Sequence, residues 1–334
     1  MQKKYLVTGA AGFIGSHFAI NVCESGDKVV VLDKLSYAGN LNNLSKIANS
    51  PNFRFVQNDI CNKEIVSKIL NEEQIDYIVN FAAESHVDNS IKSPFEFIQT
   101  NIVGTFNLLD CALKYWQNLE GEKKDNFRFL HVSTDEVFGS LELDSPKFNE
   151  ENPYKPNSPY SASKASSDHL VRAWFETYNL PVITTNCSNN FGPHQHQEKL
   201  IPTVIRNAVL GNIIPIYGNG KNIRDWIYVV DHANGIYTSL HKGRLGESYC
   251  FGGECEKENI DIARKICEIL DEVKPLNSGK SYKEQIKFVQ DRLGHDKRYA
   301  IDNTKVATEF GFAPSKTFEE RLKETVIWYL ENRS

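Results

Sequence analysis

The chain has 334 residues, of which 40% are hydrophobic and 24% charged, and its formal net charge is −5. This composition predicts a globular protein with one large or two ordinary domains. No cluster of Lys and Arg indicates a nucleic-acid partner, and no apolar run approaches the ~20 residues of a membrane span. The N-terminus lacks the pattern of a signal peptide, and the seven cysteines form no CxxC pair. We therefore expect reduced thiols in a cytoplasmic protein.

The first half of the chain alternates short apolar strands with helices. The expected strands are Lys4–Thr8, Lys28–Asp33, Asn52–Asn58, Asp76–Ala82, Phe127–Ser133 and Pro181–Asn186. The expected helices are Phe13–Ser25, Asn62–Glu72, Pro94–Tyr115 and Tyr160–Tyr178. This order predicts an α/β fold of the Rossmann type, in which a doubly wound parallel sheet has helices on both faces.

The pattern becomes less regular after about Asn190. Loop-rich segments over residues 189–202, 214–226 and 291–302 surround two expected helices, Ile260–Val273 and Thr317–Leu330. We therefore expect a first domain over residues 1–190 and a smaller, loop-rich lobe over residues 191–334. Some segments of that lobe are expected to return to the first domain.

A glycine-rich motif, "VTGAAGFIGS", follows the first strand and opens the first helix. Gly9, Gly12 and Gly15 allow a tight turn and close approach of a pyrophosphate to the helix N-terminus. Asp33 ends the second strand, where a carboxylate binds both ribose hydroxyls and repels a 2′-phosphate. The motif predicts an NAD site, and a purely structural strand–turn–helix is the alternative.

Tyr160 and Lys164 are four residues apart on an expected helix and therefore share one face. An ammonium near a phenol favours the phenolate and should lower the pKa of Tyr160, which makes the pair a general base for an alcohol. The same spacing also occurs by chance on exposed helices. Its place after a dinucleotide motif favours the catalytic interpretation.

Thr134, Asp135 and Glu136 follow a buried strand in "HVSTDEVFG". One interpretation is structural, because Thr and Asp commonly begin turns and helices. The other is catalytic: a hydroxyl beside an acid and a base. Two neighbouring carboxylates favour protonation of one of them, since like charges disfavour double ionisation.

These motifs together resemble a known family. The glycine spacing, "NDI" at Asn58–Ile60 and "NFAAESH" at Asn80–His86 are similar to the extended short-chain dehydrogenases. "DKLSYAGNLNNL", "STDEVFG", "PYSASKASSDHLVRAW", "NCSNNFGP" and "DRLGHDKRYAID" resemble the dTDP-glucose 4,6-dehydratases of that superfamily's nucleotide-sugar branch. The resemblance extends over essentially the whole chain.

The resemblance implies a hydro-lyase with tightly bound NAD that makes a 4-keto-6-deoxy sugar nucleotide. It implies that Thr134 binds the reacting hydroxyl, and that Tyr160, with Lys164, takes the proton from the sugar 4-hydroxyl as hydride leaves C4. Glu136 then removes the C5 proton, and protonated Asp135 donates to the departing C6 hydroxyl. Hydride finally returns to C6.

The expected binding residues extend from the glycine motif to the second lobe. The expected cofactor-binding residues are Gly9, Gly12, Phe13, Ile14, Gly15, Asp33, Lys34, Leu35, Ser36, Asp59, Ile60, Ala82, Ala83, Ser85, Thr100, Tyr160, Lys164 and Asn190. The expected substrate-binding residues are Ser85, His86, Thr134, Asn189, Lys199, Leu200, Pro215, Tyr217, Arg224, Asn259, Asp291, Arg292 and His295. Arg suits a diphosphate, although a salt bridge with Asp225 is the alternative for Arg224.

We expect no metal, although His194, His196 and Glu198 could be drawn as ligands, because their loop borders a site whose chemistry needs none. The resemblance also implies a homodimer, formed by helices near Pro94–Tyr115 and Tyr160–Tyr178 that pack as a four-helix bundle. No nucleic acid and no membrane are expected as partners.

Several alternatives remain. The chain ends at Ser334, before a segment that binds the base in many relatives, so UDP-glucose or UDP-N-acetylglucosamine are alternative substrates. A nucleotide-sugar 4-epimerase would share Thr134, Tyr160 and Lys164 but would have no use for Asp135 and Glu136. A UDP-glucuronate decarboxylase would need a basic contact that the sequence does not identify. A non-catalytic NAD-binding regulator would not need the intact Tyr160–Lys164 pair.

Overall fold

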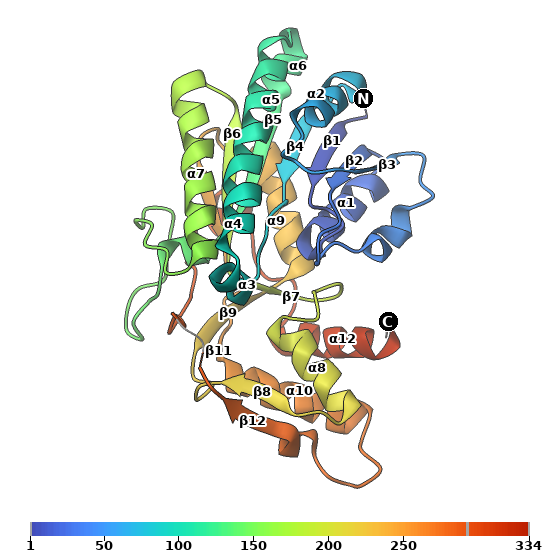
Figure 1. Cartoon of the computed structure of the whole chain (residues 1–334), viewed down its shortest axis with the longest axis vertical. Helices are drawn as coiled ribbons and strands as arrows, with labels where there is room; N and C mark the ends of the chain where they lie inside the picture. The colour runs from blue at the N-terminus through green and yellow to red at the C-terminus, as the bar shows by residue number, and fades with distance from the viewer. Residues whose placement is uncertain (1, 292–293, 333–334) are drawn as a thin grey trace.

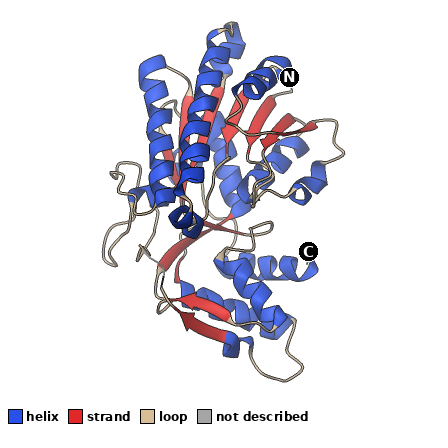
Figure 2. Ribbon diagram, viewed as in Figure 1, coloured by secondary structure: helices blue, strands red, loops and turns tan. Residues whose placement is uncertain are grey.

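The computed structural model describes residues 2–291 and 294–332, and a seven-stranded parallel sheet forms its centre (Figures 1 and 2). In spatial order the strands are β10 (Ser248–Phe251), β6 (Val182–Cys187), β5 (Arg128–Thr134), β4 (Tyr77–Asn80), β1 (Lys4–Thr8), β2 (Lys28–Asp33) and β3 (Phe53–Gln57). The strand order reverses between β1 and β4, which is the position where open α/β sheets bind ligands. The expected Rossmann-type fold is confirmed.

Helices cover both faces of this sheet. One face packs against α1 (Phe13–Glu24), η1 (Leu41–Ile47), α9 (Val229–Lys242) and α11 (Thr304–Phe310). The other packs against α2 (Lys63–Glu73), α5 (Thr105–Gln117) and α7 (Pro159–Tyr178). Adjacent residues of β1 illustrate the alternation, since Tyr5 joins the first core and Leu6 the second. Because both faces are covered, the strands are continuous apolar runs, and the expected bounds of β1 and β2 are confirmed.

The long helix expected over Pro94–Tyr115 is present, but it is not α-helical throughout. After α3 (Val87–Lys92), the chain forms α4 (Pro94–Phe97), a π-helical segment η2 (Ile98–Gly104) and then α5. Asn101 explains the π-helical segment, because its amide bonds the backbone of Glu84 and the Ser163 hydroxyl, with Nδ2 2.8 Å from Ser163 Oγ. Such irregular turns occur often at functional sites.

A second group of elements lies below the main sheet in Figure 1. It comprises the strands β7 (Asn189–Phe191), β8 (Ile214–Tyr217), β9 (Ile223–Tyr228), β11 (Glu256–Glu258) and β12 (Ile286–Val289), with helices α8 (Leu200–Leu210), α10 (Asn259–Val273), α12 (Phe318–Glu331) and η4 (Tyr282–Gln285). The segments expected to be loop-rich therefore contain β7, α8, β8 and β9. These strands have six residues or fewer and are interrupted by polar side chains, so their sequence shows little periodicity.

The chain crosses between the two regions more than once. After β9 it returns to the main sheet through α9 and β10, and β10 pairs in parallel with β6. It then passes through β11 and α10 before α11 packs against the main sheet again. Two further short helices are α6 (Gly121–Asn126) and η3 (Asp135–Phe138).

Candidate active site

A cavity of about 270 Å³ lies at the carboxyl ends of β1, β2, β4, β5 and β6. It brings together expected residues that are far apart in the sequence: Gly9, Gly12, Phe13, Ile14, Gly15, Asp33, Lys34, Ser36, Asp59, Ile60, Ala82, Ala83, Ser85, Thr100, Thr134, Asp135, Glu136, Tyr160, Lys164, Asn189, Asn190 and Lys199. The site extends from the glycine-rich turn to the Tyr160–Lys164 pair. A single elongated ligand can therefore contact both.

The glycine-rich turn is closely packed against its neighbours. Gly9 has φ of +68°, and a Cβ there would lie 2.6 Å from the backbone nitrogen of Ala82. A Cβ at Gly15 would lie 2.8 Å from Ala10 Cα, so the third glycine lets α1 approach the turn. The N-terminus of α1 has no side-chain cap and no acidic residue in its first turn. Its N–H groups and positive dipole end can therefore bind an anion.

Asp33 is fixed at the end of β2 by two backbone N–H groups. Its Oδ2 accepts from Ala11 at 2.9 Å and its Oδ1 from Leu35 at 2.8 Å. Burial raises the pKa of Asp33, and these two hydrogen bonds oppose that shift. The neighbouring ammonium of Lys34 lies 3.1 Å from Glu84 and donates to Thr100 Oγ1 at 2.9 Å. Its charge is therefore compensated within the protein.

Thr134 serves the structural purpose that the sequence suggested and also lines the cavity. Its hydroxyl caps η3 by accepting from the N–H of Glu136 at 3.3 Å, and it donates to Asp135 Oδ1 at 3.3 Å. The structural and catalytic interpretations of this stretch are therefore compatible.

Asp135 is a buried carboxyl, 2% exposed, whose pKa is raised well above its usual range. Burial is the largest cause, and the charge of neighbouring Glu136 is the next. The sequence identified only the smaller of these two causes. Its Oδ2 is buried without a hydrogen-bond partner among the residues that the structure describes, so it can bond a group that enters the cavity. Burial therefore favours the protonated form of Asp135, which is the form that can donate a proton.

Tyr160 and Lys164 occupy successive turns at the start of α7. Ser158 and Ser161 form a capping box that fixes where this helix begins, and Pro159 is its first residue. Lys164 donates to the carbonyl oxygen of Val132 at 2.8 Å. The helix thus holds both side chains at the ends of β5 and β6.

We expected Lys164 to lower the pKa of Tyr160, but in the protein alone this pKa is raised. Burial raises that pKa well above the usual range, and the charge of Glu136 adds to the effect. The hydrogen bond with Thr134 opposes the shift. Burial also lowers the pKa of Lys164, because the ammonium is withdrawn from water. The sequence argument considered a pair in water, whereas the structure places it in a protein interior.

Other expected residues lie away from this cavity lining, in loops or in the second group of elements. They are Leu35, His86, Leu200, Pro215, Tyr217, Arg224, Asn259, Asp291 and His295. Arg224 lies 4.4 Å over the ring of Tyr299 and donates to the carbonyl oxygen of Asp296 at 3.1 Å. Its neighbour Asp225 accepts instead from backbone N–H groups of 253 and 255, since adjacent strand residues point to opposite faces. Arg292 lies outside the described residues.

Ser85 and Lys199 connect the two regions at the cavity, because the Lys199 ammonium donates to the carbonyl oxygen of Ser85 at 3.0 Å. Glu198 lies 3.8 Å from His86 and 3.6 Å from His196. Over residues 2–291 and 294–332, no group of three or more His, Cys, Asp or Glu side chains has the arrangement of a metal site. Within the same residues, no helix is long and apolar enough to cross a membrane.

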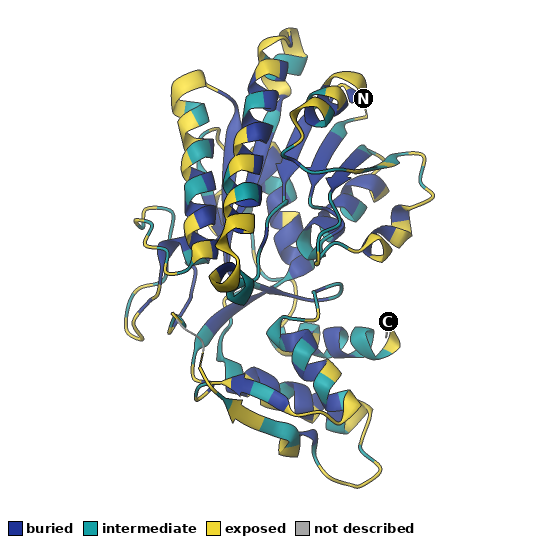
Figure 3. Cartoon of the chain, in the orientation of Figure 1, coloured by how far each residue is buried: buried dark blue, intermediate teal, exposed yellow. Residues whose placement is uncertain are grey.

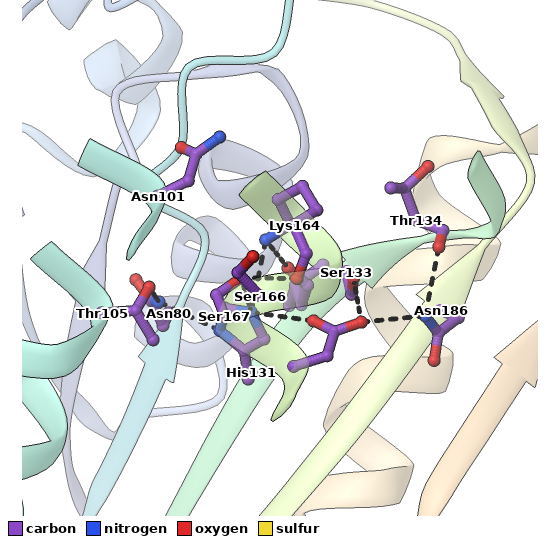
Figure 4. A network of polar contacts seen from close by, with 12 residues as sticks. Asn80, Asn101, Thr105, His131, Ser133, Thr134, Lys164, Ser166, Ser167 and Asn186 are labelled. Atoms are coloured by element: carbon purple, nitrogen blue, oxygen red, sulfur yellow. Dashed lines mark hydrogen bonds and ion pairs between the residues drawn. The ribbon is translucent and has the colours of Figure 1, made fainter. Parts of the chain in front are cut away.

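The sequence did not identify a buried polar network behind Lys164 (Figure 4). Its main members are His131 on β5 and Asp168 on α7, both buried. His131 Nε2 lies 3.3 Å from both the Lys164 ammonium and Asp168 Oδ1. Cys187 and Ser188 also line the cavity without having been expected, although "NCSNNFGP" contains both. The sequence could have indicated His131, because it is a polar residue inside a strand that was expected to be buried.

Comparisons with known proteins agree with this geometry. The family model described as GDP-mannose 4,6 dehydratase matches residues 6–325. The dTDP-glucose 4,6-dehydratase of Xanthomonas campestris pv. campestris is 53% identical, over 99% of this chain and 94% of its own length. The Haemophilus influenzae enzyme of that name is 51% identical, over 98% of both chains.

The chain belongs to the dTDP-glucose 4,6-dehydratase family. A solved structure of such an enzyme from Bacillus anthracis, in complex with NAD, is 44% identical with a TM-score of 0.87 and covers 99% of this chain and 97% of its own. The Streptomyces venezuelae dehydratase DesIV, with NAD and dTDP bound, is 42% identical with a TM-score of 0.90, and the coverage is 99% and 98%.

The fold alone does not separate this family from its neighbours. A UDP-glucose 4-epimerase of Thermotoga maritima is 26% identical with a TM-score of 0.86, over 98% of this chain and 99% of its own. The chain is therefore assigned to the dehydratase family by its sequence identity, which is 53% with the Xanthomonas enzyme and 26% with this epimerase.

Proposed function

We propose that this protein is a dTDP-glucose 4,6-dehydratase that uses tightly bound NAD and makes dTDP-4-keto-6-deoxyglucose. One observation carries the proposal beyond the fold. Asp135, a buried carboxyl with a raised pKa, and neighbouring Glu136 line the same cavity as Thr134, Tyr160 and Lys164. Water elimination needs an acid and a base of this kind, whereas a 4-epimerase needs neither.

The residues present fit NAD. The uncapped N-terminus of α1 suits the pyrophosphate, and Asp33 at the end of β2 suits the adenosine ribose hydroxyls. Tyr160 and Lys164 line the opposite part of the cavity and would hold the nicotinamide ribose. When bound, the cofactor supplies a hydride acceptor that later returns the hydride.

Oxidation at C4 requires removal of the proton from the sugar 4-hydroxyl. Tyr160 takes this proton, and Thr134, which bonds Tyr160, orients the same hydroxyl. Tyr160 must be a phenolate to act as base, yet burial and Glu136 raise its pKa. The positive charge of Lys164 opposes these influences, so the charge state of that lysine determines how much active base exists.

Elimination then uses the two carboxyl groups. The 4-keto group makes the C5 proton acidic, and Glu136 removes it. Asp135 donates its proton to the departing C6 hydroxyl, so that one water leaves. Because burial raises the pKa of Asp135 in the protein alone, its acid form is favoured before the substrate binds.

The second group of elements is proposed to bind the nucleotide diphosphate. Asn189 and Lys199 reach the cavity, and Arg224 is a buried cation on β9 in the second group of elements. The remaining proposed substrate contacts are His86, Leu200, Pro215, Tyr217, Asn259, Asp291, Arg292 and His295. DesIV, with dTDP bound, supports this assignment because it covers nearly the whole chain.

We propose that the active form is a cytoplasmic homodimer. The seven free cysteines support a reducing compartment. Adjacent large apolar side chains on α4, η2 and α5 are exposed, including Phe95 at 67% and Phe106 at 45%. Figure 3 shows exposed residues along both α5 and α7, which pack side by side. A second copy would cover these faces as a four-helix bundle.

The test is mass spectrometry of products after the purified protein is incubated separately with dTDP-glucose, UDP-glucose and UDP-N-acetylglucosamine. Loss of one water from dTDP-glucose supports the proposed reaction and substrate. Water loss only from a UDP sugar would support the dehydratase reaction but identify a UDP sugar as the substrate. Unchanged mass with inverted C4 would replace the dehydratase proposal with an epimerase.

A further inference from the structure

The buried carboxylate of Asp168 has no part in the reaction proposed above. It lies one helical turn after Lys164 on α7, so the two side chains share a face. Its Oδ2 accepts from Ser133 Oγ at 2.7 Å and from the Tyr154 hydroxyl at 3.0 Å. Its Oδ1 accepts no hydrogen bond from the part of the chain that the structure describes. Burying a carboxylate in this way costs free energy, and the surroundings must offset that cost.

One atom of the His131 ring, Nε2, lies close to both this carboxylate and the Lys164 ammonium. His131 Nε2 is 3.3 Å from Asp168 Oδ1 and 3.3 Å from Lys164 Nζ. Figure 4 shows the Lys164 and His131 side chains pointing toward each other. Of these three residues, Lys164 lines the cavity, whereas His131 and Asp168 are buried behind it.

His131 is neutral in this group. The Thr8 hydroxyl donates to Asn80 Oδ1 at 2.6 Å, which leaves the amide Nδ2 of Asn80 to donate to His131 Nδ1 at 3.1 Å. Nδ1 is therefore the unprotonated nitrogen, and the proton resides on Nε2. Burial and Lys164 lower the pKa of His131 to about 4. His131 thus fixes the geometry but does not neutralise Asp168.

We propose that Asp168 is a positioning residue whose negative charge, acting across the neutral His131 ring, keeps Lys164 protonated and in place behind the catalytic tyrosine. The inference rests on the proposed function, because the charge of Lys164 affects turnover only if Tyr160 is the base. The network around Asp168 leaves Lys164 with one fixed acceptor, the carbonyl oxygen of Val132.

The charges around Lys164 show why Asp168 matters. Burial lowers the pKa of Lys164, and Asp168 is the largest influence in the opposite direction. Cys187, at the end of β6, would act in the same direction only as a thiolate, and burial raises its pKa, which keeps it neutral. From η3, Asp135 faces the site in its protonated form. Glu136 is the other carboxylate of that segment, and its charge also acts on Tyr160.

The test compares the wild-type holoenzyme with Asp168→Asn across pH. The variant keeps the shape and the hydrogen bonds of the side chain but removes its charge. Lys164 then loses its proton at lower pH, and Tyr160 needs a higher pH to become phenolate. We expect kcat near pH 7 to fall by about tenfold or more with KM changed less than about threefold. The acidic limb of the kcat profile should move to higher pH and the basic limb to lower pH.

Tyr154→Phe is the matched control. It removes one hydrogen bond from Asp168 Oδ2 but leaves the charge, so it should leave both limbs of the pH profile in place. If Asp168→Asn and Tyr154→Phe lower kcat alike while neither moves the limbs, Asp168 has only a structural role and the proposal is overturned.

A direct titration of Lys164 separates this inference from the proposed function. Lysine carrying ¹³C at Cε is incorporated, and the Lys164 signal is assigned by its loss in Lys164→Arg. A lower titration midpoint in Asp168→Asn supports the proposal, and equal midpoints overturn it, whether or not the sugar is converted. Should the variant not fold, a wild-type Lys164 that deprotonates below about pH 7 overturns the proposal, and one that stays protonated supports it. Absence of turnover in the wild type would instead count against the proposed function.

Discussion

Replacing Asp135 with Asn separates the chemistry of this carboxyl from its place in the fold. The amide has the shape of a protonated carboxyl, and it can still accept the hydrogen bond from Thr134 Oγ1. It cannot give up an acidic proton. If Asp135 is the acid that protonates the C6 hydroxyl, the variant should bind NAD and oxidise C4 normally but fail to lose water.

The substitution should change both the rate of the elimination step and the pH dependence of stability. Loss of a positioned general acid lowers the rate of its step by about 10²–10⁴-fold. Because the folded-state pKa of Asp135 is raised, its contribution to stability is fully present below the unfolded value of about 3.9 and is lost as pH rises toward the folded pKa. The neutral Asn side chain does not titrate, so its contribution to stability does not fall as pH rises. The free energy of unfolding of Asp135→Asn, relative to wild type, should therefore increase between about pH 4 and pH 7, by on the order of 1 kcal/mol or more.

Two assays measure these effects. Rapid mixing with dTDP-glucose, followed by absorbance of the reduced nicotinamide and mass of the quenched sugar, should show C4 oxidation without dehydrated product. Urea unfolding at two pH values gives the stability difference. Dehydration at the wild-type rate would refute the acid role. A stability difference between variant and wild type that stays the same at about pH 4 and pH 7 would refute the conclusion that burial raises the pKa of this carboxyl.

Four further predictions concern other parts of the site and surface. Glu136→Gln should retain C4 oxidation but lose incorporation of deuterium at C5 from D₂O, as followed by NMR. Tyr160→Phe should lower kcat by about 10²-fold or more with little change in substrate KM, and an unchanged kcat would remove the phenol from the mechanism. Gly15→Ala places a Cβ 2.8 Å from Ala10 Cα and should cost about 1–3 kcal/mol of unfolding free energy while weakening NAD binding, as measured by urea unfolding and calorimetry. Phe106→Glu should yield monomers in sedimentation experiments. Phe288→Glu, at a site on β12 that is more exposed (58% against 45%), should not.

The sequence by itself was sufficient for the features that depend on local spacing. The strands Lys4–Thr8 and Lys28–Asp33 were predicted with their bounds, because strands buried on both faces form continuous apolar runs. The glycine turn and the Tyr160–Lys164 pair were recognisable because each lies within a few residues of one element. Their convergence in one cavity follows from parallel strands, whose carboxyl ends share one edge.

Only the tertiary structure decided the protonation states and the residues behind the site. The pKa of Asp135 is raised mainly by burial, and the pKa of Tyr160 is raised rather than lowered, because packing by distant segments removes both from water. The π-helical turn at Asn101 depends on Glu84 and Ser163, which come from other elements. His131 lies on β5 and Asp168 on α7, so only the packing of these two elements brings them together. Desolvation and long-range pairing are properties of the packed chain, and no local spacing specifies them.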